Sequence, residues 1–255
     1  MNRDQPVGVF DSGVGGISVL RELVRVLPHE NFIYYGDSKN APYGTKSPEE
    51  VKRLSYSCVD HLLGQGAKAI VVACNTATSA AIASLRQDQP QIPFIGIEPA
   101  IKPAALFLPH PFVVVMATSM TIREKKFHEL FERFDEEAEI APVSCSRLVE
   151  FVERGETRGA AIEQYLTEKL SPYLGKADAI VLGCTHFPFA REAIQKVAGE
   201  KVLLFDGAEG TARECKNRLK ALDLLSDRTE NGTVEIQNSL GESGAELAGR
   251  LLDQT

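Results

Sequence analysis

The sequence lacks long hydrophobic runs and has no excess of positive charge. Its longest uninterrupted apolar stretches, such as residues 69–74 and 112–117, span six residues, whereas a helix needs about 20 apolar residues to cross a bilayer. The 28 Lys and Arg residues are outnumbered by 35 Asp and Glu residues, and no basic block stands out. Because nucleic acids are bound through clustered Lys and Arg, we expect neither a membrane nor a nucleic acid as partner.

Cysteine is scarce as well. The chain has five cysteines, an odd number, and none of them forms a CxxC pair. This pattern argues against a disulfide framework and against a structural zinc site, and no other metal-ligand spacing is present. The N-terminal residues do not have the pattern of a secretory signal, so a reducing cytoplasm is the simplest compartment.

What the sequence does contain is an alternation of short apolar runs with amphipathic helical patterns. Continuous apolar runs suit strands that are covered on both faces. A helix is predicted to begin at Ser47, because Pro48 in the first helical position and Glu50 three residues after the cap form a capping box. The alternation predicts an α/β fold with mostly parallel sheets. We expect buried strands at residues 7–10, 32–35, 69–73, 94–97, 112–117, 140–143, 179–182 and 202–205.

A weak internal repeat divides the chain into two similar parts. The segment 69–76 (AIVVACNT) resembles the segment 179–186 (AIVLGCTH) at an offset of 110 residues, and the segment 7–12 resembles 113–118 at an offset of 106. The general likeness of buried strands explains the second pair equally well, but the first pair also shares a cysteine at the strand end. We therefore predict two similar α/β lobes that deliver one cysteine each to a shared cleft, since ligands bind outside the carboxyl ends of parallel strands.

Cys74 and Cys184 are the candidate reactive groups. Cys74 follows a predicted strand, and Asn75 and Thr76 can cap the next helix, whose positive end lowers the pKa of a nearby thiol. Cys184 has the same setting, with His186 as a possible proton partner two residues away. A single such cysteine is more often a small core residue, but two in matched positions favour paired acid–base chemistry.

The other three cysteines, Cys58, Cys145 and Cys215, are expected to be packing residues. A disulfide between Cys74 and Cys184 would need Cα atoms within about 7 Å of each other. A substrate cleft between the two cysteines would prevent that approach.

The segment DSGVGG at the end of the first strand allows two interpretations. Gly13 and Gly15 fit the first two positions of the GxGxxG nucleotide fingerprint, and Asp37 lies near the place of its ribose-binding acid. However, Ser18 stands where the third Gly or Ala belongs. Alternatively, the glycines form a tight turn that exposes backbone N–H groups to a substrate carboxylate. The nucleotide interpretation leaves both cysteines unexplained.

Other polar residues near strand ends suit a small anionic ligand. Pro42, Tyr43 and Gly44 form a predicted turn that offers a hydroxyl and free amides. Thr118 and Thr121 follow the strand at 112–117 and can offer hydroxyls, although capping a helix is their plainer role. Together these residues predict a pocket for a small anion.

Two opposed thiols at one cleft predict a racemase reaction. One group removes a proton from one face of a stereocentre while the other returns a proton to the opposite face. With reacting contacts of about 3–3.5 Å on each side of the carbon, the two sulfurs should lie roughly 7 Å apart. Without pyridoxal phosphate or a metal, the donors of the pocket must stabilise the carbanion.

Five motifs follow one another along nearly the whole chain: DSGVGGISVL, YYGDSKNAPYGTKS, VVACNTATS, IGIEPAIKPA and LGCTHFP. Together they resemble those of the cofactor-independent glutamate racemases of bacteria. The resemblance implies an active site between two α/β lobes, one formed by residues 1–97 and 208–255 and the other by residues 98–207. It also implies interconversion of L- and D-glutamate without a cofactor, supply of D-glutamate for peptidoglycan, and a homodimer.

The resemblance further implies roles for individual residues. Cys74 is the expected base for D-glutamate, assisted by Asp11, and Cys184 is the expected base for L-glutamate, assisted by His186. The residues expected to contact the substrate are Asp11, Ser12, Pro42, Tyr43, Gly44, Asn75, Thr76, Thr118, Thr121, Thr185 and His186.

Two positions depart from the usual family pattern. Ala117 stands where Gly is usual, next to the loop that begins at Thr118. Glu150 stands where many members have Pro, close to Glu153. The resemblance implies that Glu153 is a catalytic carboxylate near His186, whereas its sequence pattern alone is typical of a solvated surface residue.

Two other functions fit the same residues. An aspartate racemase of the same group would share both cysteines, and the length of the substrate that the pocket accepts decides between the two. A non-catalytic amino-acid-binding protein could keep the fold. It would have no need of two paired bases and their helper residues.

Overall fold

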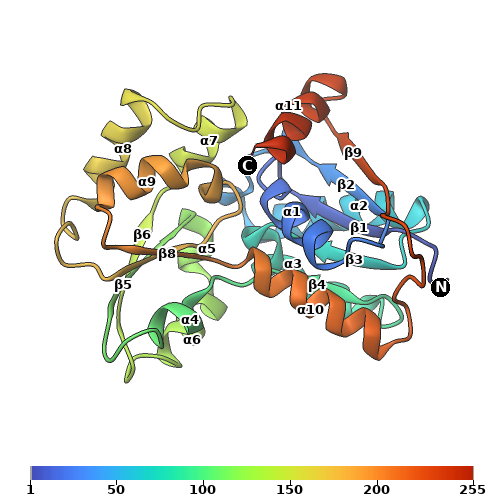
Figure 1. Ribbon diagram of the computed structural model, residues 1–255, viewed down its shortest axis with the longest axis horizontal. Coiled ribbons are helices and arrows are strands. Elements are labelled where there is room, and N and C mark those ends of the chain that lie inside the picture. The colour runs from blue at the N-terminus through green and yellow to red at the C-terminus, as the bar shows by residue number, and fades with distance from the viewer. Residues whose placement is uncertain (1, 255) are drawn as a thin grey trace.

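The protein contains two parallel β-sheets. The computed structural model describes residues 2–254, with the side chain of Lys126 left out. The strand order is β4-β3-β1-β2-β9 in the first sheet and β6-β5-β7-β8 in the second, and every strand pairing is parallel. Each sheet has helices on both faces, and the two layered halves lie side by side (Figure 1). The predicted α/β fold with two parallel-sheet lobes is confirmed.

The first sheet combines the N-terminal and C-terminal parts of the chain. On one face it packs against α1, α10 and α11, and on the other against α2 and α3. Its strands are β1 (Val7–Asp11), β2 (Phe32–Gly36), β3 (Ala69–Val72), β4 (Phe94–Gly96) and β9 (Val234–Asn238). The helices are α1 (Ile17–Val26), α2 (Pro48–Gly64), α3 (Asn75–Asp88), α10 (Ala208–Ala221) and α11 (Glu242–Asp253). Two short 3-10 helices, η1 (Ser38–Asn40) and η2 (Tyr43–Thr45), follow β2.

The second sheet is built from the middle of the chain. It packs against α7, α8 and α9 on one face and against α4 and α6 on the other. Its strands are β5 (Phe112–Ala117), β6 (Glu139–Ser144), β7 (Ala179–Leu182) and β8 (Leu203–Asp206). The helices are α4 (Ile101–Ala105), α5 (Ser119–Arg123), α6 (Lys125–Glu132), α7 (Arg147–Glu153), α8 (Ala160–Leu170), the 3-10 helix η3 (Phe187–Ala190) and α9 (Arg191–Ala198).

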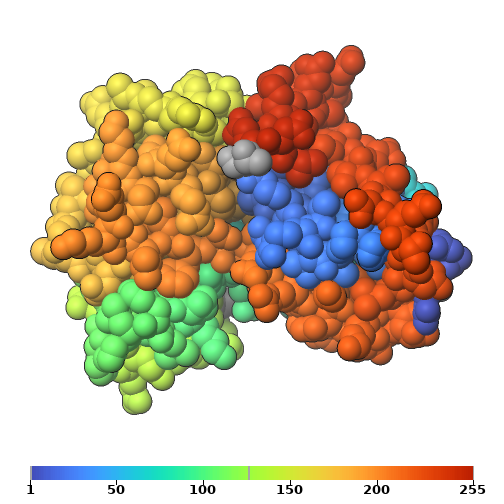
Figure 2. Space-filling view, viewed as in Figure 1, coloured from blue at the N-terminus to red at the C-terminus, as the bar shows by residue number. Residues whose placement is uncertain are grey.

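The space-filling view shows how the two halves divide the surface. N-terminal blue and C-terminal red residues form one side of the visible face, and residues from the middle of the sequence form the other (Figure 2). None of the helices within residues 2–254 combines the length and the apolar composition that crossing a bilayer requires.

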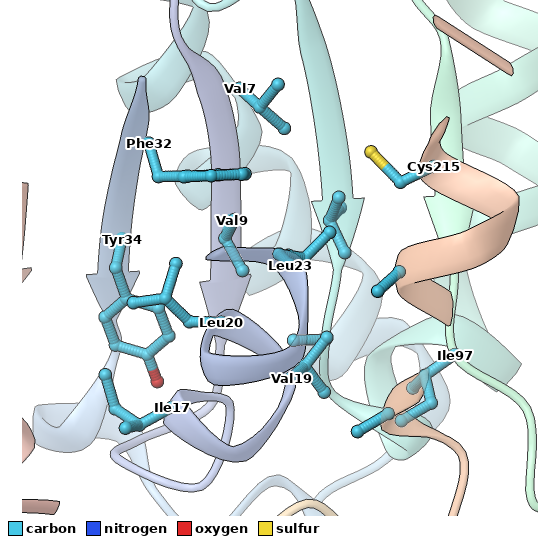
Figure 3. Close-up of a cluster of buried hydrophobic side chains, with 14 of the residues drawn as sticks. Val7, Val9, Ile17, Val19, Leu20, Leu23, Phe32, Tyr34, Ile97 and Cys215 are labelled. Carbon is cyan, nitrogen blue, oxygen red and sulfur yellow. The ribbon is translucent and has the colours of Figure 1, made fainter. Parts of the chain in front are cut away.

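Side chains of each central strand alternate between two apolar cores. Val7 and Val9 face α1 and α10, where Cys215 packs among them (Figure 3), while Phe10 faces α2 on the opposite side of the sheet. All residues of β1, β3 and β7 are buried. Each fully buried aliphatic or aromatic side chain contributes roughly 1.5–3 kcal/mol, so burial on both faces stabilises these strands and accounts for their continuous apolar sequences.

All eight predicted strands are present, but β9 was not predicted. Its residues alternate between apolar and polar, with Val234 and Ile236 half-buried and Glu235 exposed. As an edge strand it pairs with β2 alone, from Val234 beside Phe32 to Asn238 beside Gly36. This pairing returns the end of the chain to the first sheet.

Helix α2 begins as predicted. Ser47 is its N-cap, and the Ser47 hydroxyl accepts a hydrogen bond from the Glu50 N–H at 3.2 Å. Pro48 occupies the first turn, where its missing N–H costs nothing. The Glu50 carboxylate pairs with Lys46 Nζ at 3.0 Å.

The register of the sheets confirms the internal repeat. Val7 of β1 pairs with Ala69 of β3, and Val113 of β5 pairs with Ala179 of β7. The two pairs are related by the offsets found in the sequence, 113 − 7 = 106 and 179 − 69 = 110. The strand orders β4-β3-β1-β2 and β8-β7-β5-β6 are equivalent. Both repeated segments therefore end at corresponding places, where ligands bind in parallel sheets.

Candidate active site

Cys74 and Cys184 lie directly beyond the carboxyl ends of β3 and β7. Their exposed fractions are 5% and 8%, and all five cysteines are free thiols. The other three cysteines are buried within the apolar cores, as predicted. Cys58 also has a polar neighbour, the Tyr43 hydroxyl at 3.8 Å from its sulfur, so the two cysteines of the repeat are distinguished by their matched positions at strand ends.

Cys74 is itself the N-cap of α3. Its Sγ accepts a hydrogen bond from the Ala77 N–H at 3.4 Å, whereas Asn75 and Thr76, the predicted caps, lie inside the first turn. Burial and then the charge of Asp11 raise the pKa of Cys74, and the Ala77 N–H lowers it by less. The prediction of a lowered pKa is wrong for the free protein, because loss of hydration outweighs the effect of the helix end.

Cys74 is connected to Asp11 through a hydroxyl. The Cys74 thiol donates to Ser12 Oγ at 3.6 Å, and the Ser12 hydroxyl donates to Asp11 Oδ1 at 3.4 Å. The other carboxylate oxygen of Asp11 accepts a hydrogen bond from the Thr185 hydroxyl at 2.9 Å. Burial raises the pKa of the Asp11 carboxyl group. We call Cys74, Ser12 and Asp11 the Cys74 half-site.

Cys184 faces an imidazole–carboxylate pair. Its Sγ lies 3.7 Å from His186 Nδ1, and His186 Nε2 lies 2.6 Å from Glu153 Oε1. Burial lowers the pKa of His186, but the hydrogen bonds with Cys184 and Glu153 outweigh it and raise that pKa well above its ordinary value. Burial raises the pKa of Glu153, but the hydrogen bond and charge of His186, with the bonds from the Val14 N–H and the Ser38 hydroxyl, together lower it below its ordinary value. These two shifts favour an imidazolium beside a carboxylate over a neutral pair. We call Cys184, His186 and Glu153 the Cys184 half-site.

Glu153 is placed beside His186, as the resemblance implied, and is not the solvated residue that its pattern alone suggested. Its side chain is 17% exposed. Glu153 Oε1 also accepts a hydrogen bond from the Val14 N–H at 2.8 Å, and Oε2 accepts one from the Ser38 hydroxyl at 3.1 Å. A carboxylate carried by α7 is thus held by residues that follow β1 and β2. Glu150, one turn earlier, is exposed.

The glycines of the DSGVGG segment make room for this pair. A Cβ atom at Gly13 would lie 1.8 Å from Glu153 Oε1, and one at Gly15 would lie 2.3 Å from His186 Nδ1. Contacts this short are impossible, so only glycine allows the second lobe to approach here. The sequence carried a signal for this role, the two closely spaced glycines, but did not identify which side chains they admit.

The nucleotide-fingerprint interpretation of this segment is wrong. Asp37, the candidate ribose-binding acid, is buried and accepts hydrogen bonds from the Tyr43 hydroxyl at 2.7 Å and from the Asn40 amide at 3.0 Å. Ser18, at the third fingerprint position, donates its hydroxyl to the Thr185 carbonyl at 2.9 Å. These residues hold the protein's own loops in place.

Three threonine hydroxyls form a buried cluster where the two sheets meet. Thr76 Oγ1 lies 3.1 Å from Thr118 Oγ1 and 3.2 Å from Thr121 Oγ1, and the last two are 2.9 Å apart. Thr118 is also the N-cap of α5, since its hydroxyl accepts from the Thr121 N–H at 3.3 Å. Hydroxyl groups can both donate and accept, so the cluster can turn its protons toward a carboxylate.

Asn75 has unsatisfied hydrogen-bonding groups. Both polar atoms of its side chain are buried and have no partner among the described residues. Leaving such a group unpaired costs roughly 1–3 kcal/mol, which a ligand that bonds to the amide would offset. Asn75 and Thr121 also line a cavity of about 310 Å³ that extends between α3 and α6.

The turn at Pro42, Tyr43 and Gly44 contributes backbone groups. The Tyr43 hydroxyl donates to Asp37, so this hydroxyl is engaged within the protein. Pro42 is the N-cap of η2, and the first N–H groups of a helix have no intrahelical acceptor. Gly44 packs against the second lobe, since a Cβ there would lie 2.6 Å from Thr118 Cβ. The turn can therefore offer amides, not the predicted hydroxyl, to an anion.

The predicted site residues therefore come from both lobes and meet at the carboxyl ends of their strands. Among the residues that the structure describes, no three Cys, His, Asp or Glu side chains are grouped to bind one metal ion. What the arrangement provides is two thiols with separate proton partners, surrounded by hydroxyl and amide donors.

Comparison with known proteins identifies the family. Residues 7–215 match the Asp/Glu/Hydantoin racemase family. The glutamate racemase of Clostridium novyi is 51% identical over 236 residues, which cover 92% of this chain and 91% of the relative. That of Clostridium perfringens is 47% identical over 253 residues, covering 98% and 97%. The crystal structure of glutamate racemase from Francisella tularensis in complex with D-glutamate superimposes with a TM-score of 0.84 at 29% identity, covering 99% of this chain and 95% of that one. The chain therefore belongs to the Asp/Glu/Hydantoin racemase family.

Proposed function

We propose that the protein interconverts L- and D-glutamate by transferring a proton at Cα between two opposed thiols. The observation that carries this proposal is the placement of Cys74 and Cys184 at equivalent strand ends, each with its own proton partner. Relatives that are 47% and 51% identical over most of the chain are glutamate racemases, and a structural neighbour binds D-glutamate.

In the L-to-D direction, the Cys184 thiolate accepts the α-proton of L-glutamate and the Cys74 thiol gives its proton to the opposite face. One C–H bond breaks and another forms, and the thiol and the thiolate exchange places. Burial keeps Cys74 protonated in the free protein, which suits its role as the proton donor in this direction, and His186 Nδ1 lies 3.7 Å from the Cys184 sulfur. In the reverse direction, Cys74 is the base.

The proton partners return the thiols to their starting states. After an L-to-D turnover, Cys74 is the thiolate and can regain a proton through Ser12 and Asp11, whose hydrogen bonds lead away from the sulfur. Cys184 is then the thiol, and His186 can take its proton once the imidazolium has passed its Nε2 proton to Glu153. Asp11 and His186 thus act as the helpers that the family resemblance implies.

The negative charge that develops at Cα spreads into the α-carboxylate, which the pocket must stabilise. We propose that substrate carboxylates and amine are bound by residues that share one property, a position at the end of a strand or the start of a helix. The unpaired Asn75 amide and the start of α3 lie next to Cys74, where the charge forms. The set is Asp11, Ser12, Pro42, Tyr43, Gly44, Asn75, Thr76, Thr118, Thr121, Thr185 and His186.

Three further features belong to this proposal. D-Glutamate would be supplied for peptidoglycan, and the enzyme would act in the cytoplasm, where a reducing environment keeps both thiols free. The protein would form a homodimer. The two lobes would consist of residues 1–97 with 208–255 and of residues 98–207, a division that agrees with the return of β9 to the first sheet.

Hydrogen–deuterium exchange followed by NMR tests the reaction and its substrate together. Purified protein is incubated in D₂O with L-glutamate, D-glutamate, L-aspartate or D-aspartate, with no cofactor added and with a metal chelator in a parallel sample. We expect loss of the α-proton from both glutamates, appearance of the opposite enantiomer, and no effect of the chelator. Exchange with aspartate alone would identify an aspartate racemase, and a folded, reduced protein that exchanges none of the four would contradict the proposal.

A further inference from the structure

A chain of hydrogen bonds extends the Cys184 half-site to the last strand of the first sheet. Asn238, the final residue of β9, donates from Nδ2 to Ser38 Oγ at 2.9 Å. Ser38, the first residue of η1, donates its hydroxyl proton to Glu153 Oε2 at 3.1 Å. The opposite oxygen of Glu153 holds His186, which faces Cys184. The thiol is thus linked to a residue 54 positions away in the sequence (238 − 184).

The direction of these hydrogen bonds is fixed by the backbone. Asn238 Oδ1 accepts a hydrogen bond from the Leu240 N–H at 2.9 Å, so the NH₂ group of the amide must be the one that faces Ser38. Ser38 Oγ accepts from that group, and its own proton points at an acceptor, the Glu153 carboxylate. Glu153 Oε2 is therefore the final acceptor of the hydrogen bonds that start at Asn238.

Two glycines fix the position of Asn238. A Cβ at Gly244 of α11 would lie 2.3 Å from Asn238 Cγ, and a Cβ at Gly36 of β2 would lie 2.7 Å from Asn238 Nδ2. The Asn238 side chain is packed between these two backbones, and the residue is 9% exposed. Such tight packing leaves the amide one orientation and makes it a rigid donor.

We propose that Ser38 and Asn238 are positioning residues for the Cys184 half-site, which hold the Glu153 carboxylate so that it orients His186 toward the sulfur. Without the Ser38 hydroxyl, Glu153 Oε2 loses its protein donor, and only the bonds of Oε1 with the Val14 N–H and His186 still orient the carboxylate. Displacements of about 1 Å in such groups can slow catalysis by up to about 100-fold. The inference rests on the proposed function for its effect on turnover, and on geometry alone for its effect on the thiol.

The first test compares Ser38→Ala with Ser38→Thr, which keeps the hydroxyl. Because Ser38 supports a positioning carboxylate and not the substrate, Ser38→Ala should lower kcat about tenfold while KM changes by less than about twofold. Ser38→Thr should recover most of kcat. L- and D-glutamate have equal free energies in water, so kcat/KM stays equal in both directions for every variant and cannot report on one thiol alone.

The second test therefore measures each thiol directly. Purified protein without substrate is treated with iodoacetamide at pH 7, and modification of Cys74 and Cys184 is followed peptide by peptide by mass spectrometry. In Ser38→Ala, Cys184 should react about tenfold more slowly, while Cys74 in the same molecules changes by less than about twofold. Ser55→Ala, which removes a buried hydroxyl bonded to the Val51 carbonyl within α2, is the matched control and should leave both rates unchanged.

Asn238→Ala tests the first hydrogen bond of the series, the one from Asn238 to Ser38. If Asn238 acts through Ser38, Asn238→Ala should slow the alkylation of Cys184 and leave that of Cys74 unchanged. Introduced into Ser38→Ala, it should slow the alkylation of Cys184 by less than about a further twofold. An unchanged Cys184 rate in folded Ser38→Ala, or equal slowing of both thiols, would overturn the proposal for Ser38. Further slowing in the double variant would overturn it for Asn238. The alkylation rates are measured without substrate. They therefore test the roles of Ser38 and Asn238 even if the protein does not racemise glutamate.

Discussion

The two half-sites occupy equivalent places in two similar sheets, yet they hold their thiols in different ways. Cys74 caps a helix and donates to a hydroxyl, which leads to a buried carboxyl group whose pKa is raised. Cys184 lies beside an imidazolium that is paired with a carboxylate. One thiol is thus connected to a carboxyl group through a hydroxyl, and the other faces an imidazole–carboxylate pair directly.

The two thiols have different neighbours because a repeated fold controls backbone positions and not the side chains around them. Strand pairing fixes the positions of the two cysteine backbones, because Val7–Ala69 and Val113–Ala179 are equivalent pairs. It does not choose the side chains that reach each sulfur. Those come from non-equivalent loops and helices, so a symmetric scaffold surrounds its two thiols with different hydrogen-bond partners.

Removing either thiol should have the largest effect. We expect Cys74→Ser and Cys184→Ser each to lower kcat/KM for racemisation by at least about 10³-fold, because a general acid or base is lost. Chiral chromatography of the products measures this loss. Cys215→Ala, a cavity-forming change in the apolar core, is the control and should keep its activity.

A β-chlorinated glutamate then tests each cysteine as a base separately. Elimination needs one base only: the thiolate takes the α-proton, chloride leaves, and the resulting enamine hydrolyses to a 2-oxo acid and ammonium. Cys74→Ser should act on the L-analogue through Cys184, and Cys184→Ser on the D-analogue through Cys74. Full racemisation by either variant would refute the two-base mechanism.

Gly15→Ala should disrupt the Cys184 half-site selectively. The new Cβ would lie 2.3 Å from His186 Nδ1, so the imidazole must move away from Cys184, and kcat should fall about 100-fold. Gly210→Ala in α10, where a Cβ meets nothing within 4 Å, is the matched control. It should keep full activity and gain roughly 0.5–1 kcal/mol of stability. Normal turnover by Gly15→Ala would show that His186 need not stay where it is.

The smallest predicted effect concerns stability against pH. Glu153 has a lowered pKa, so its contribution is present above its unfolded pKa and is lost as pH falls through the folded value. His186 has a raised pKa, so its contribution is complete below its unfolded value near 6.5 and is lost as pH rises through the folded one. Their joint contribution should be greatest between about pH 5 and 6.5.

Urea unfolding of Glu153→Gln across this pH range measures that contribution. The variant should be less stable than the parent protein by about 2 kcal/mol between pH 5 and 6.5, and the difference should shrink on both sides. Cys215→Ala in the apolar core removes a thiol that burial keeps protonated, so its stability difference should stay constant from about pH 5 to 8. A pH-independent difference for Glu153→Gln would mean that the imidazolium–carboxylate pair does not form.

The predictable part of the fold is the part with continuous apolar sequence. Strands β1, β3 and β7 are buried on both faces, so their composition reveals them. Strand β9 escaped prediction because it lies at a sheet edge and alternates polar with apolar residues, as loops and half-exposed helices also do. Nothing in the sequence of β9 indicates that it pairs with β2.

The predictable part of the site is the part that follows strand ends. Cys74 and Cys184 were found because a cysteine repeated at matched strand ends is rarely accidental. Glu153 was ambiguous, since a glutamate on a short helix looks solvated until the opposite lobe covers it. Ser38 and Asn238 gave no signal, because their importance lies in contacts between segments 115 and 200 residues apart.

The sequence by itself determined which chemistry is available: two thiols, an imidazole and the Asp11 carboxyl group at the ends of two repeated strand patterns. Local composition carries this information because burial, helix capping and tight turns depend on neighbouring residues. Only the tertiary structure decided which thiol is kept neutral and which faces a charge, because pKa values depend on desolvation and on partners from the other lobe. The tertiary structure also showed the role of Gly13 and Gly15. They do not form a phosphate-binding loop but leave room for the side chains of Glu153 and His186.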